Sequence, residues 1–294
     1  MQQRKKMNNQ TLKGILPINK PQGWTSFDVV NKIKHIIGVR GLKIGHLGTL
    51  DPMATGVLLV TIGKATKLFD IMQQKTKTYL ATFEFGFETD TLDSTGEQTN
   101  QSDVLPTKEQ IEAVLPKFVG KIQQIPPKYS AKSVNGKRAY DLARENKDFE
   151  LKPCKVEIKS LKLIDYFNNV LTLQIVCGSG TYIRALGRDI AYSLGSFATM
   201  TSLVRTNIDE FSIEKCKEIG QIDSQNVLQN IVKIKAVLNL PEINFDEKQT
   251  AKILNGQTLN VNKNNGLYLL NDAIDTIAIV EINDFKAKMS IFLA

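Results

Sequence analysis

The sequence predicts an α+β fold, with a mixed, mainly antiparallel sheet that is flanked by helices. Segments with the alternating pattern of half-buried strands are mixed with segments of helical periodicity, without the regular strand–helix alternation of a doubly wound sheet. After residue 239 the helical pattern ends, and short strand-like runs between Asn, Asp and Gly turns take its place. This change of texture predicts a separate small β-rich domain.

The first expected elements are a short strand and an amphipathic helix. Residues 15–18 are typical of a strand, and a Pro-Gln-Gly turn follows Lys20. Thr25 or Ser26 can cap the next helix, and Gly38 ends it, as is common just past a helix C-terminus. One face of this helix carries apolar residues that we expect in the core: Phe27, Val30, Ile33 and Ile37.

Further strands and a second helix are expected in the middle of the chain. The apolar run 57–62, bounded by glycines, is typical of a buried strand. Alternation predicts strands at 79–87 and 170–177, each with one apolar face. A helix with apolar residues at helical spacing follows from Ile183 to Leu194. In the C-terminal part we expect strands at 266–270, 276–282 and 289–293.

The net charge is +8, and the excess is concentrated near the N-terminus. Residues 1–64 hold ten Lys and Arg but only two acidic residues, Asp28 and Asp51, whereas the rest of the chain is balanced. A local basic surface favours a polyanionic partner, because positive side chains displace counterions from phosphates. A solvated lysine-rich surface would give the same charge.

Several classes of protein are excluded by the sequence. No apolar run approaches the roughly 18–20 residues of a membrane span, and the polar N-terminus does not resemble a secretory signal. Three widely spaced cysteines indicate neither a disulfide framework nor a zinc knuckle. With two histidines and no metal-binding motif, a catalytic metal is not expected. The segments around Gly63 and Gly178 lack the residues of a P-loop and a dinucleotide-binding motif.

Residues 45–56 form the segment that is richest in special residues. Three glycines permit tight turns or close approach to a ligand. Pro52 favours an extended backbone at Asp51, which would fix the direction of its carboxylate. The pattern predicts a rigid loop that presents His46 and Asp51. An ordinary turn with a structural histidine has the same composition, so the residues alone leave both readings open.

Six segments in chain order together resemble the TruB family of pseudouridine synthases. The loop Gly45-His46-x-Gly-Thr-Leu-Asp51-Pro resembles the catalytic motif of the family. The resemblance covers about residues 14–210. The other matching segments are 14–26 (a lysine–proline motif), 77–79 with 86–96, 126–144 (the segment that grips the T arm), 180–184 (the arginine partner of the aspartate) and 203–205 (a pocket wall).

The resemblance implies an isomerase, an intramolecular transferase that converts the T-loop uridine (uridine 55) of tRNA to pseudouridine. It implies a pseudouridine synthase catalytic domain over residues 1–239, with an RNA-gripping insertion at about 126–152, and a small PUA-like RNA-binding domain over 240–294. The reaction rejoins the same atoms, so no cofactor and no metal are expected. The implied partner is the T arm and elbow of tRNA. We expect a cytoplasmic monomer with no membrane association and no obligatory protein partner.

Asp51 is expected to be the catalytic carboxylate, either as nucleophile or as base. An ionised aspartate in a partly desolvated pocket needs an opposing charge, and Arg184 is the candidate. Because the base must leave its stack, residues that receive it are required. The resemblance implies substrate-binding roles for Lys20, His46 (filling the space of the displaced base), Tyr79 (stacking), Tyr182 (contact with the flipped ring) and Leu203 (apolar wall).

Two departures from the family pattern and two other functions remain open. Leu47 stands where Thr or Ser is common, and Asn19 where Asp is common, so the loop contacts and the charge beside Lys20 could differ. A tRNA-folding chaperone that acts by binding alone is one alternative. A relative that modifies ribosomal RNA is the other. A pure binder has no use for an arginine-paired carboxylate, which favours the enzyme.

Overall fold

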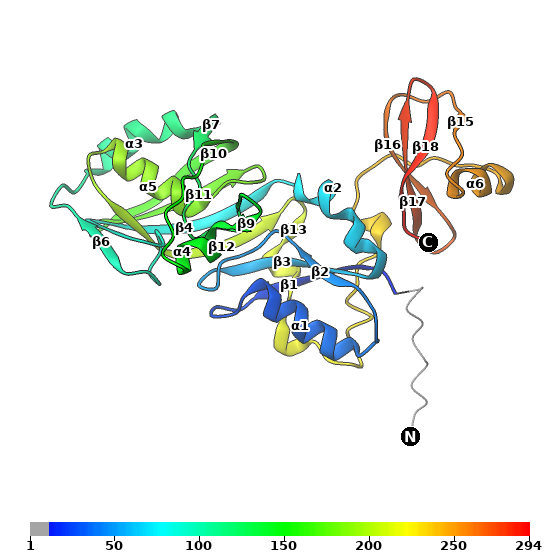
Figure 1. The fold of residues 1–294 in the computed structure, drawn as a ribbon, viewed down its shortest axis with the longest axis horizontal. Coiled ribbons are helices and arrows are strands. Elements are labelled where there is room, and N and C mark those ends of the chain that lie inside the picture. The colour runs from blue at the N-terminus through cyan, green and yellow to red at the C-terminus, as the bar shows by residue number, and fades with distance from the viewer. Residues whose placement is uncertain (1–11) are drawn as a thin grey trace. The chain divides into compact units, whose positions relative to one another are not determined.

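The computed structural model describes residues 12–294, which form two compact units. Unit 1 comprises residues 12–51, 58–73 and 215–294, and unit 2 comprises residues 52–57 and 74–214. The ribbon in Figure 1 shows strands and helices mixed along the chain, and mostly strands in the orange-to-red C-terminal part. The expected α+β class is confirmed.

Unit 1 contains the first strands of the chain, a long helix and the β-rich C-terminal part. Strand β3 is divided between the units, its first three residues belonging to unit 2. The elements are β1 (Gly14–Lys20), α1 (Ser26–Ile37), β2 (Ile44–Leu47), β3 (Thr55–Ile62), the 3-10 helix η1 (Gly63–Leu68), α2 (Phe69–Gln73), β14 (Lys217–Glu218), η4 (Ile219–Gln221), η5 (Ile234–Ala236), α6 (Glu247–Leu254), β15 (Leu259–Asn260), β16 (Gly266–Asn271), β17 (Thr276–Asn283) and β18 (Lys286–Phe292).

Helix α1 starts and ends as its sequence predicts. Thr25 is the N-cap and forms a capping box with Asp28, and Gly38 closes the C-terminus with a left-handed φ of 66°. The expected buried position of Phe27 is wrong, because its side chain is 64% exposed. Helical geometry accounts for this, since Phe27 lies about 100° away from the centre of the stripe that Ser26 and Ile33 share.

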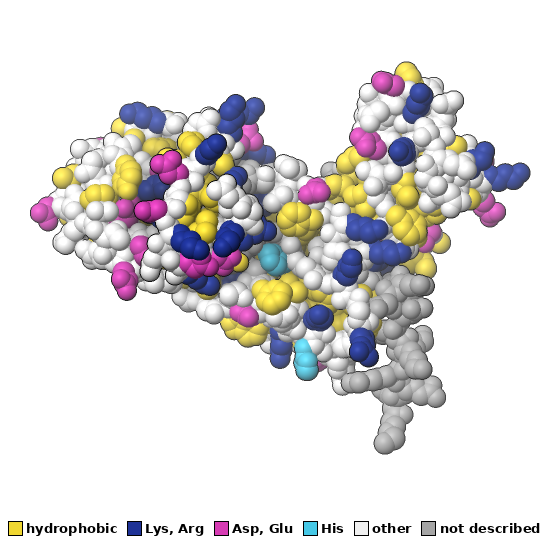
Figure 2. All heavy atoms as spheres, viewed as in Figure 1, with side chains coloured by type: hydrophobic (Ala, Val, Ile, Leu, Met, Phe, Trp, Pro, Cys, Tyr) yellow, Lys and Arg dark blue, Asp and Glu magenta, His cyan; other side chains and the backbone are white. Residues whose placement is uncertain are grey.

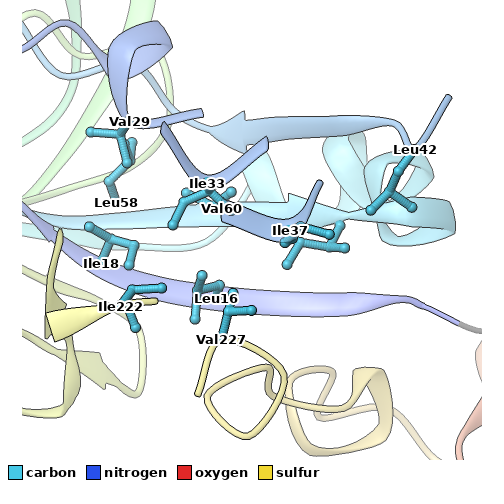
Figure 3. Packing of buried hydrophobic residues seen from close by; sticks show 11 residues of the cluster. Leu16, Ile18, Val29, Ile33, Ile37, Leu42, Leu58, Val60, Ile222 and Val227 are labelled. Carbon is cyan, nitrogen blue, oxygen red and sulfur yellow. The ribbon is translucent and has the colours of Figure 1, made fainter. Parts of the chain in front are cut away.

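The buried stripe of α1 forms the main core of unit 1. Figure 3 shows Val29, Ile33 and Ile37 directed at side chains of the neighbouring strands. The strand side of this core comes from β1 and β3, with two residues from the segment after β14: Leu16, Ile18, Leu58, Val60, Ile222 and Val227. Burial of this stripe fixes α1, and with α1 the residues at its N-terminus.

The C-terminal strands form their own four-stranded sheet, in the order β15-β18-β17-β16. Strands β16 and β17 agree with the expected ranges to within one residue, whereas β18 begins at Lys286, three residues before its expected start. Helix α6 was not expected. It has eight residues, and only Ile253 among them is buried, so its apolar periodicity is too short to detect. The domain boundary at 239/240 and the PUA-like character of this part stay predictions.

Unit 2 is built on an antiparallel sheet in the order β12-β4-β11-β10-β7. The first residues of β3 add a parallel edge to β12. The elements are β4 (Lys77–Phe85), β5 (Phe87–Thr89), β6 (Gln98–Gln101), α3 (Lys108–Val114), η2 (Leu115–Phe118), β7 (Gly120–Gln124), β8 (Ser133–Val134), β9 (Lys137–Arg138), α4 (Ala139–Arg144), β10 (Cys154–Phe167), β11 (Val170–Cys177), α5 (Ile183–Ser193), β12 (Ala198–Ile208) and β13 (Phe211–Ser212); η3 (Ile213–Lys215) lies at the boundary between the units.

Helix α5 packs closely on this sheet. A Cβ atom at Gly187 would lie 2.3 Å from ring atoms of Phe83 in β4, so the helix backbone rests on that ring. The expected apolar face is buried, with Ile183, Leu186 and Ile190 all in the core. Close packing of this kind holds the helix rigidly, and the residues at its first turn are positioned with it.

Candidate active site

Asp51 lies in the loop that connects β2 and β3. The two strands pair antiparallel, with Leu47 opposite Leu59. Gly48, the first residue of the loop, has a φ of 81°, a left-handed conformation that glycine adopts without strain. Asp51 itself is half-buried. The expected loop around Asp51 is present, whereas His46, which was expected in the same loop, lies in strand β2.

The residue before Asp51 is held on both of its backbone groups by helix α1. The N–H of Leu50 donates to Ser26 Oγ at 2.9 Å, and Ser26 Oγ donates to the carbonyl of Leu50 at 3.2 Å. Ser26 and Leu50 are both buried. Hydrogen bonds in a buried environment are costly to break, so the backbone that leads into Asp51 is fixed relative to α1.

Lys20 ends strand β1 and is fully buried, at 0% exposed. Its Nζ donates to the carbonyls of Pro21 at 2.9 Å and Trp24 at 2.6 Å. A buried ammonium group needs such partners, because burial without them is strongly unfavourable. These bonds tie the turn that leads into α1. The substrate-binding role of Lys20 stays a prediction.

His46 and the two departures from the family pattern also lie in unit 1. His46 is half-buried in β2, opposite Val60. Leu47 is buried, so its apolar side chain is accommodated in the core. Asn19 donates through Nδ2 to Glu218 Oε1 at 2.7 Å. Leu47 and Asn19 are thus both accommodated by contacts within unit 1. The role of His46 stays a prediction.

The start of β3 is held in unit 2 by Arg205. Gly56 pairs with Arg205, and a Cβ atom at Gly56 would lie 2.2 Å from the carbonyl oxygen of Arg205. Arg205 Nε donates to the carbonyl of Val57 at 2.7 Å. This close approach of two backbones explains why the residue that ends the motif is a glycine.

Tyr79 and Leu203 lie on the neighbouring strands β4 and β12. Tyr79 is opposite Arg205 on one side and Ile175 on the other, and Leu203 is opposite Ala81. Both side chains are largely buried. Tyr182 is the N-cap residue of α5 and is half-buried. The proposed contacts of these three residues with a flipped base stay predictions.

Arg184 lies in the first turn of α5, as expected, but it is not a surface residue. Its side chain is only 7% exposed. Nη1 donates to the carbonyl of Thr91 at 2.7 Å and lies 3.4 Å from Asp93 Oδ2. Nη2 donates to the carbonyl of Tyr129 at 3.0 Å. Three groups from two separate segments therefore orient this guanidinium.

Asp93 is the acidic partner of Arg184 in unit 2, and the sequence did not single it out. Its other oxygen, Oδ1, accepts from Thr91 Oγ1 at 2.9 Å, Thr95 N at 3.0 Å and Thr95 Oγ1 at 2.5 Å. The carboxylate is buried and held in a tight loop. These hydrogen bonds fix the direction in which the carboxylate faces Arg184.

Lys77 and Cys177 lie opposite each other on β4 and β11. Burial, together with the nearby charge of Arg205, lowers the pKa of Lys77 to about 8. Burial raises the pKa of the Cys177 thiol to about 11. Lys77 therefore titrates near neutral pH, whereas Cys177 stays a neutral thiol.

The candidate residues divide between the two units. Lys20, His46 and Asp51 belong to unit 1. The candidates in unit 2 are Tyr79, Tyr182, Arg184 and Leu203. Sequence reasoning missed Ser26 as the anchor of the loop and Asp93 as the partner of Arg184. A Thr-x-Asp-x-Thr pattern, in which a carboxylate is flanked by hydroxyls, is the one local signal for Asp93.

The basic residues of the N-terminal part have mixed roles. Arg4, Lys5 and Lys6 lie outside the described residues. Lys13 donates to the carbonyls of Thr276 and Leu293, and Lys64 lies over the ring of Phe292 at 4.5 Å. Exposed cations remain at Lys32, Lys34, Arg40 and Lys43. On the face drawn in Figure 2, Lys and Arg side chains form several separate groups.

Within residues 12–294, no group of three or more His, Cys, Asp or Glu side chains is arranged to hold a metal ion. No helix in this described part of the chain is both long and apolar enough to cross a membrane. The expectation of a reaction without cofactor stays a prediction.

Solved structures of similar fold have low sequence identity to this chain. A Cbf5-Nop10-Gar1 complex contains a chain with a TM-score of 0.70 and 22% identity, over 96% of this chain and 85% of that one. An H/ACA RNP bound to a substrate RNA contains another, with a TM-score of 0.69 and 20% identity over the same shares. At this identity the likeness shows the fold alone.

Relatives of higher identity carry a single description. A tRNA pseudouridine synthase B of Clostridium kluyveri is 42% identical over 83% of this chain and 84% of its own length. The protein of the same description from Parabacteroides distasonis is 46% identical over 75% and 96%, and that from Mycoplasma mobile 41% over 88% and 87%. The family described as TruB family pseudouridylate synthase, N-terminal domain, matches residues 34–183. The chain therefore belongs to the TruB family of pseudouridylate synthases.

Proposed function

We propose that this isomerase converts the T-loop uridine of tRNA, uridine 55, to pseudouridine, with Asp51 as the catalytic carboxylate. In the overall reaction the bond between N1 of uracil and C1′ of ribose breaks, and a bond between C5 and C1′ forms. The proton on C5 is lost to solvent and N1 gains one, so atoms and electrons balance without an oxidant or a reductant. Asp51 acts either by attack at C1′ or by removing a ribose proton.

The relatives support tRNA as the substrate. Three proteins that are 41–46% identical to this chain are described as tRNA pseudouridine synthase B. Each alignment covers at least three quarters of both chains. We therefore infer the substrate class from these relatives and not from the fold neighbours, whose identity is near 20%.

The observation that carries the assignment of Asp51 is its fixed loop. Leu50 is bonded through both backbone groups to Ser26, and the loop leaves β2 through a left-handed glycine. A catalytic carboxylate must be held in place before the substrate arrives, because misplacement by about 1 Å can lower a rate about 100-fold. A surface turn with a merely structural aspartate does not need this anchor.

Contact with RNA is supported by exposed cations on the segment 126–152. Lys128, Lys132, Lys137 and Arg138 are exposed on this segment, three of them in or beside the hairpin β8–β9. Tyr140 lies near the guanidinium of Arg144, which is 5.6 Å from its ring. Cations interleaved with aromatic rings suit an RNA backbone and its unstacked bases.

The remaining assignments complete the proposal. Arg184 serves the reaction as the arginine partner of the catalytic aspartate, Tyr79 stacks on the extruded base, and Tyr182 contacts its ring. Lys20, His46 and Leu203 complete the substrate contacts. Residues 240–294 serve as a small RNA-binding domain, and the protein works as a cytoplasmic monomer without cofactor, membrane or obligatory protein partner.

The test is tritium release from an unmodified tRNA transcript that carries uridine labelled at C5, with purified protein and EDTA. We expect release of about one tritium per tRNA, lost when the T-loop uridine is replaced by cytidine. Asp51→Asn should abolish release and leave tRNA affinity within a few-fold, because an amide cannot act as nucleophile or base here. Asp70→Asn is the matched control, since Asp70 is an exposed aspartate of α2 in the same unit.

Other results would redirect the assignment. Turnover by Asp51→Asn at the rate of the unmodified protein would remove Asp51 from the chemistry. Tight tRNA binding without any tritium release would favour the chaperone that acts by binding alone. Release from a ribosomal RNA fragment but not from tRNA would favour the second alternative.

A further inference from the structure

The chain that enters the segment 126–152 is bonded to the N-cap residue of α5 through a buried glutamine. Gln124, the last residue of β7, has a side chain that is only 1% exposed. Its Nε2 donates to the carbonyl of Tyr182 at 3.1 Å, and its Oε1 accepts from the N–H of Tyr182 at 2.9 Å. The carboxamide thus pairs with the Tyr182 backbone on both sides, as a neighbouring strand would.

The next residues of the same segment are bonded to two arginines of α5. The carbonyl of Ile125 accepts from Arg188 Nη2 at 2.9 Å, and the carbonyl of Tyr129 accepts from Arg184 Nη2 at 3.0 Å. Arg184 and Arg188 are four residues apart and so share one face of the helix. Residues 124–129 therefore contact the N-cap and the first two turns of α5.

The hydroxyl of Tyr129 lies near the carboxylate of Asp90, and this carboxylate is the main reason why the pKa of Tyr129 is raised. Asp90 also accepts from the N–H of Glu97 at 2.9 Å, in the loop that carries Asp93. Tyr129 is therefore bonded to Arg184 through its carbonyl, and its hydroxyl lies beside Asp90 of the loop that carries Asp93.

Beyond residues 124–129 the segment is not packed closely on α5. A cavity of about 580 Å³ separates residues 143–151 from β5 and α5, with Phe149, Leu151, Arg188 and Tyr192 among its lining residues. The exposed cations lie on the other part of the segment, and the N–H of Tyr140 joins that part to the carbonyl of Ser130 at 3.0 Å. Residues 124–129 are therefore the part of the chain that connects the exposed cations to α5.

We infer that Gln124 and Tyr129 are positioning residues that couple the grip of the segment on RNA to the placement of Tyr182 and Arg184. This inference rests on the proposed function, in which Tyr182 and Arg184 serve the reaction. RNA that engages the exposed cations draws the segment into one position. The bonds of residues 124–129 then hold the N-terminus of α5 and its guanidinium in the productive arrangement.

The test compares Gln124→Met and Tyr129→Phe with matched controls. Methionine keeps the length of glutamine without its hydrogen bonds, and phenylalanine removes only the hydroxyl that lies near Asp90. Gln123→Met is the control for the first change, because Gln123 is exposed on the same strand. Tyr166→Phe is the control for the second, because its hydroxyl bonds the carbonyl of Pro106, away from α5.

Two quantities are measured for each protein: the dissociation constant for tRNA, and the single-turnover rate of tritium release with enzyme in saturating excess. We expect Gln124→Met to lower this rate about 10- to 100-fold and Tyr129→Phe about 10-fold, with affinity changed by less than about 3-fold. The controls should keep both quantities. A merely structural role would lower the active fraction but not the rate of the protein that binds.

Coupling is tested by a double-mutant cycle with Lys137→Ala and Arg138→Ala combined. Removal of these cations should lower the single-turnover rate at saturating enzyme in the unmodified protein. It should have little further effect in Gln124→Met, because the hydrogen bonds that couple the segment to α5 are already lost there. Additive effects would overturn the coupling, as would rates equal to the unmodified protein in both Gln124→Met and Tyr129→Phe. Should Gln124→Met not fold, Tyr129→Phe with the same cycle decides. Failure of the proposed function is distinct, because the unmodified protein would then release no tritium.

Discussion

The hydroxyl of Ser26 bonds both the N–H and the carbonyl of Leu50, at 2.9 and 3.2 Å. One side chain from the first turn of α1 thus fixes the residue that precedes Asp51. Because α1 is itself fixed by its buried stripe, the packing of the apolar core determines the position of this polar loop. The same principle operates in unit 2, where Gly187 seats α5 on Phe83 and Arg184 is carried by that helix.

Ser26→Ala should lower the rate of pseudouridine formation more than it lowers tRNA affinity. The substitution leaves the buried N–H and carbonyl of Leu50 without their partner, which costs about 1–3 kcal/mol of folding stability. Thr25→Ala is the control, because it costs about 1 kcal/mol through the helix cap but keeps both bonds to Leu50. Single-turnover tritium release at 25 °C decides. Equal rates for the two variants would mean that the anchor of Leu50 does not set the position of Asp51.

Asp93→Asn should lower the single-turnover rate with little change in tRNA affinity. Asparagine can keep the bonds to Thr91 and Thr95 but loses the negative charge that lies 3.4 Å from the buried guanidinium of Arg184. Breaking a buried pair in this way typically costs about 3–5 kcal/mol of stability, so the urea midpoint should also fall. Thr95→Val is the control, since it removes one bond to Asp93 but keeps the pair. A rate for Asp93→Asn that matches that of Thr95→Val would exclude a role for the charge.

Local sequence signals predicted the elements that position the site. Helix α1 was predicted from its cap and its apolar spacing, and strand β11 from its alternation, because both depend on residues that are close in sequence. Phe27 was misplaced for a specific reason. The pattern was read as apolar residues only, whereas the buried face is completed by Ser26, a polar residue that bonds Leu50.

The partners within the site could not be predicted in the same way. Arg184 was identified by its motif, but its contacts with Asp93 and Tyr129 join segments that are more than fifty residues apart. Gln124 pairs with the backbone of Tyr182, and a backbone group carries no sequence signal that would select one glutamine among many. Such contacts are decided by the tertiary fold, and the sequence-based list of site residues therefore lacked them.

The stability of the protein should rise between pH 7.5 and pH 9.5 because of Lys77. Burial lowers its pKa from the ordinary 10.5 to about 8. Below pH 8 the ammonium is charged in both states, and its burial opposes folding. Between the two pKa values the unfolded chain binds the proton and the folded chain does not, so the free energy of unfolding rises with pH, by at most about 2 kcal/mol over this range.

Lys77→Met isolates this effect, because methionine has a similar length and no proton to bind. Urea unfolding of both proteins at pH 7.5 and 9.5 measures it, since other groups titrate alike in the two proteins. The unmodified protein should gain stability relative to Lys77→Met as the pH rises. The same difference between the two proteins at both pH values would show that the ammonium stays charged in the folded state.

Leu47→Thr tests whether this departure from the family pattern serves packing or the loop. Leu47 is buried in β2 opposite Leu59, which is also buried. Threonine removes apolar volume and buries a hydroxyl, so we expect a loss of about 2–4 kcal/mol in the free energy of unfolding, with the single-turnover rate unchanged at low temperature. Leu228→Thr is the control, because Leu228 is an exposed leucine of the same unit. Should Leu47→Thr keep its stability and change its rate, Leu47 would act on the contacts of the Asp51 loop, since packing alone cannot alter turnover without altering the fold that supports it.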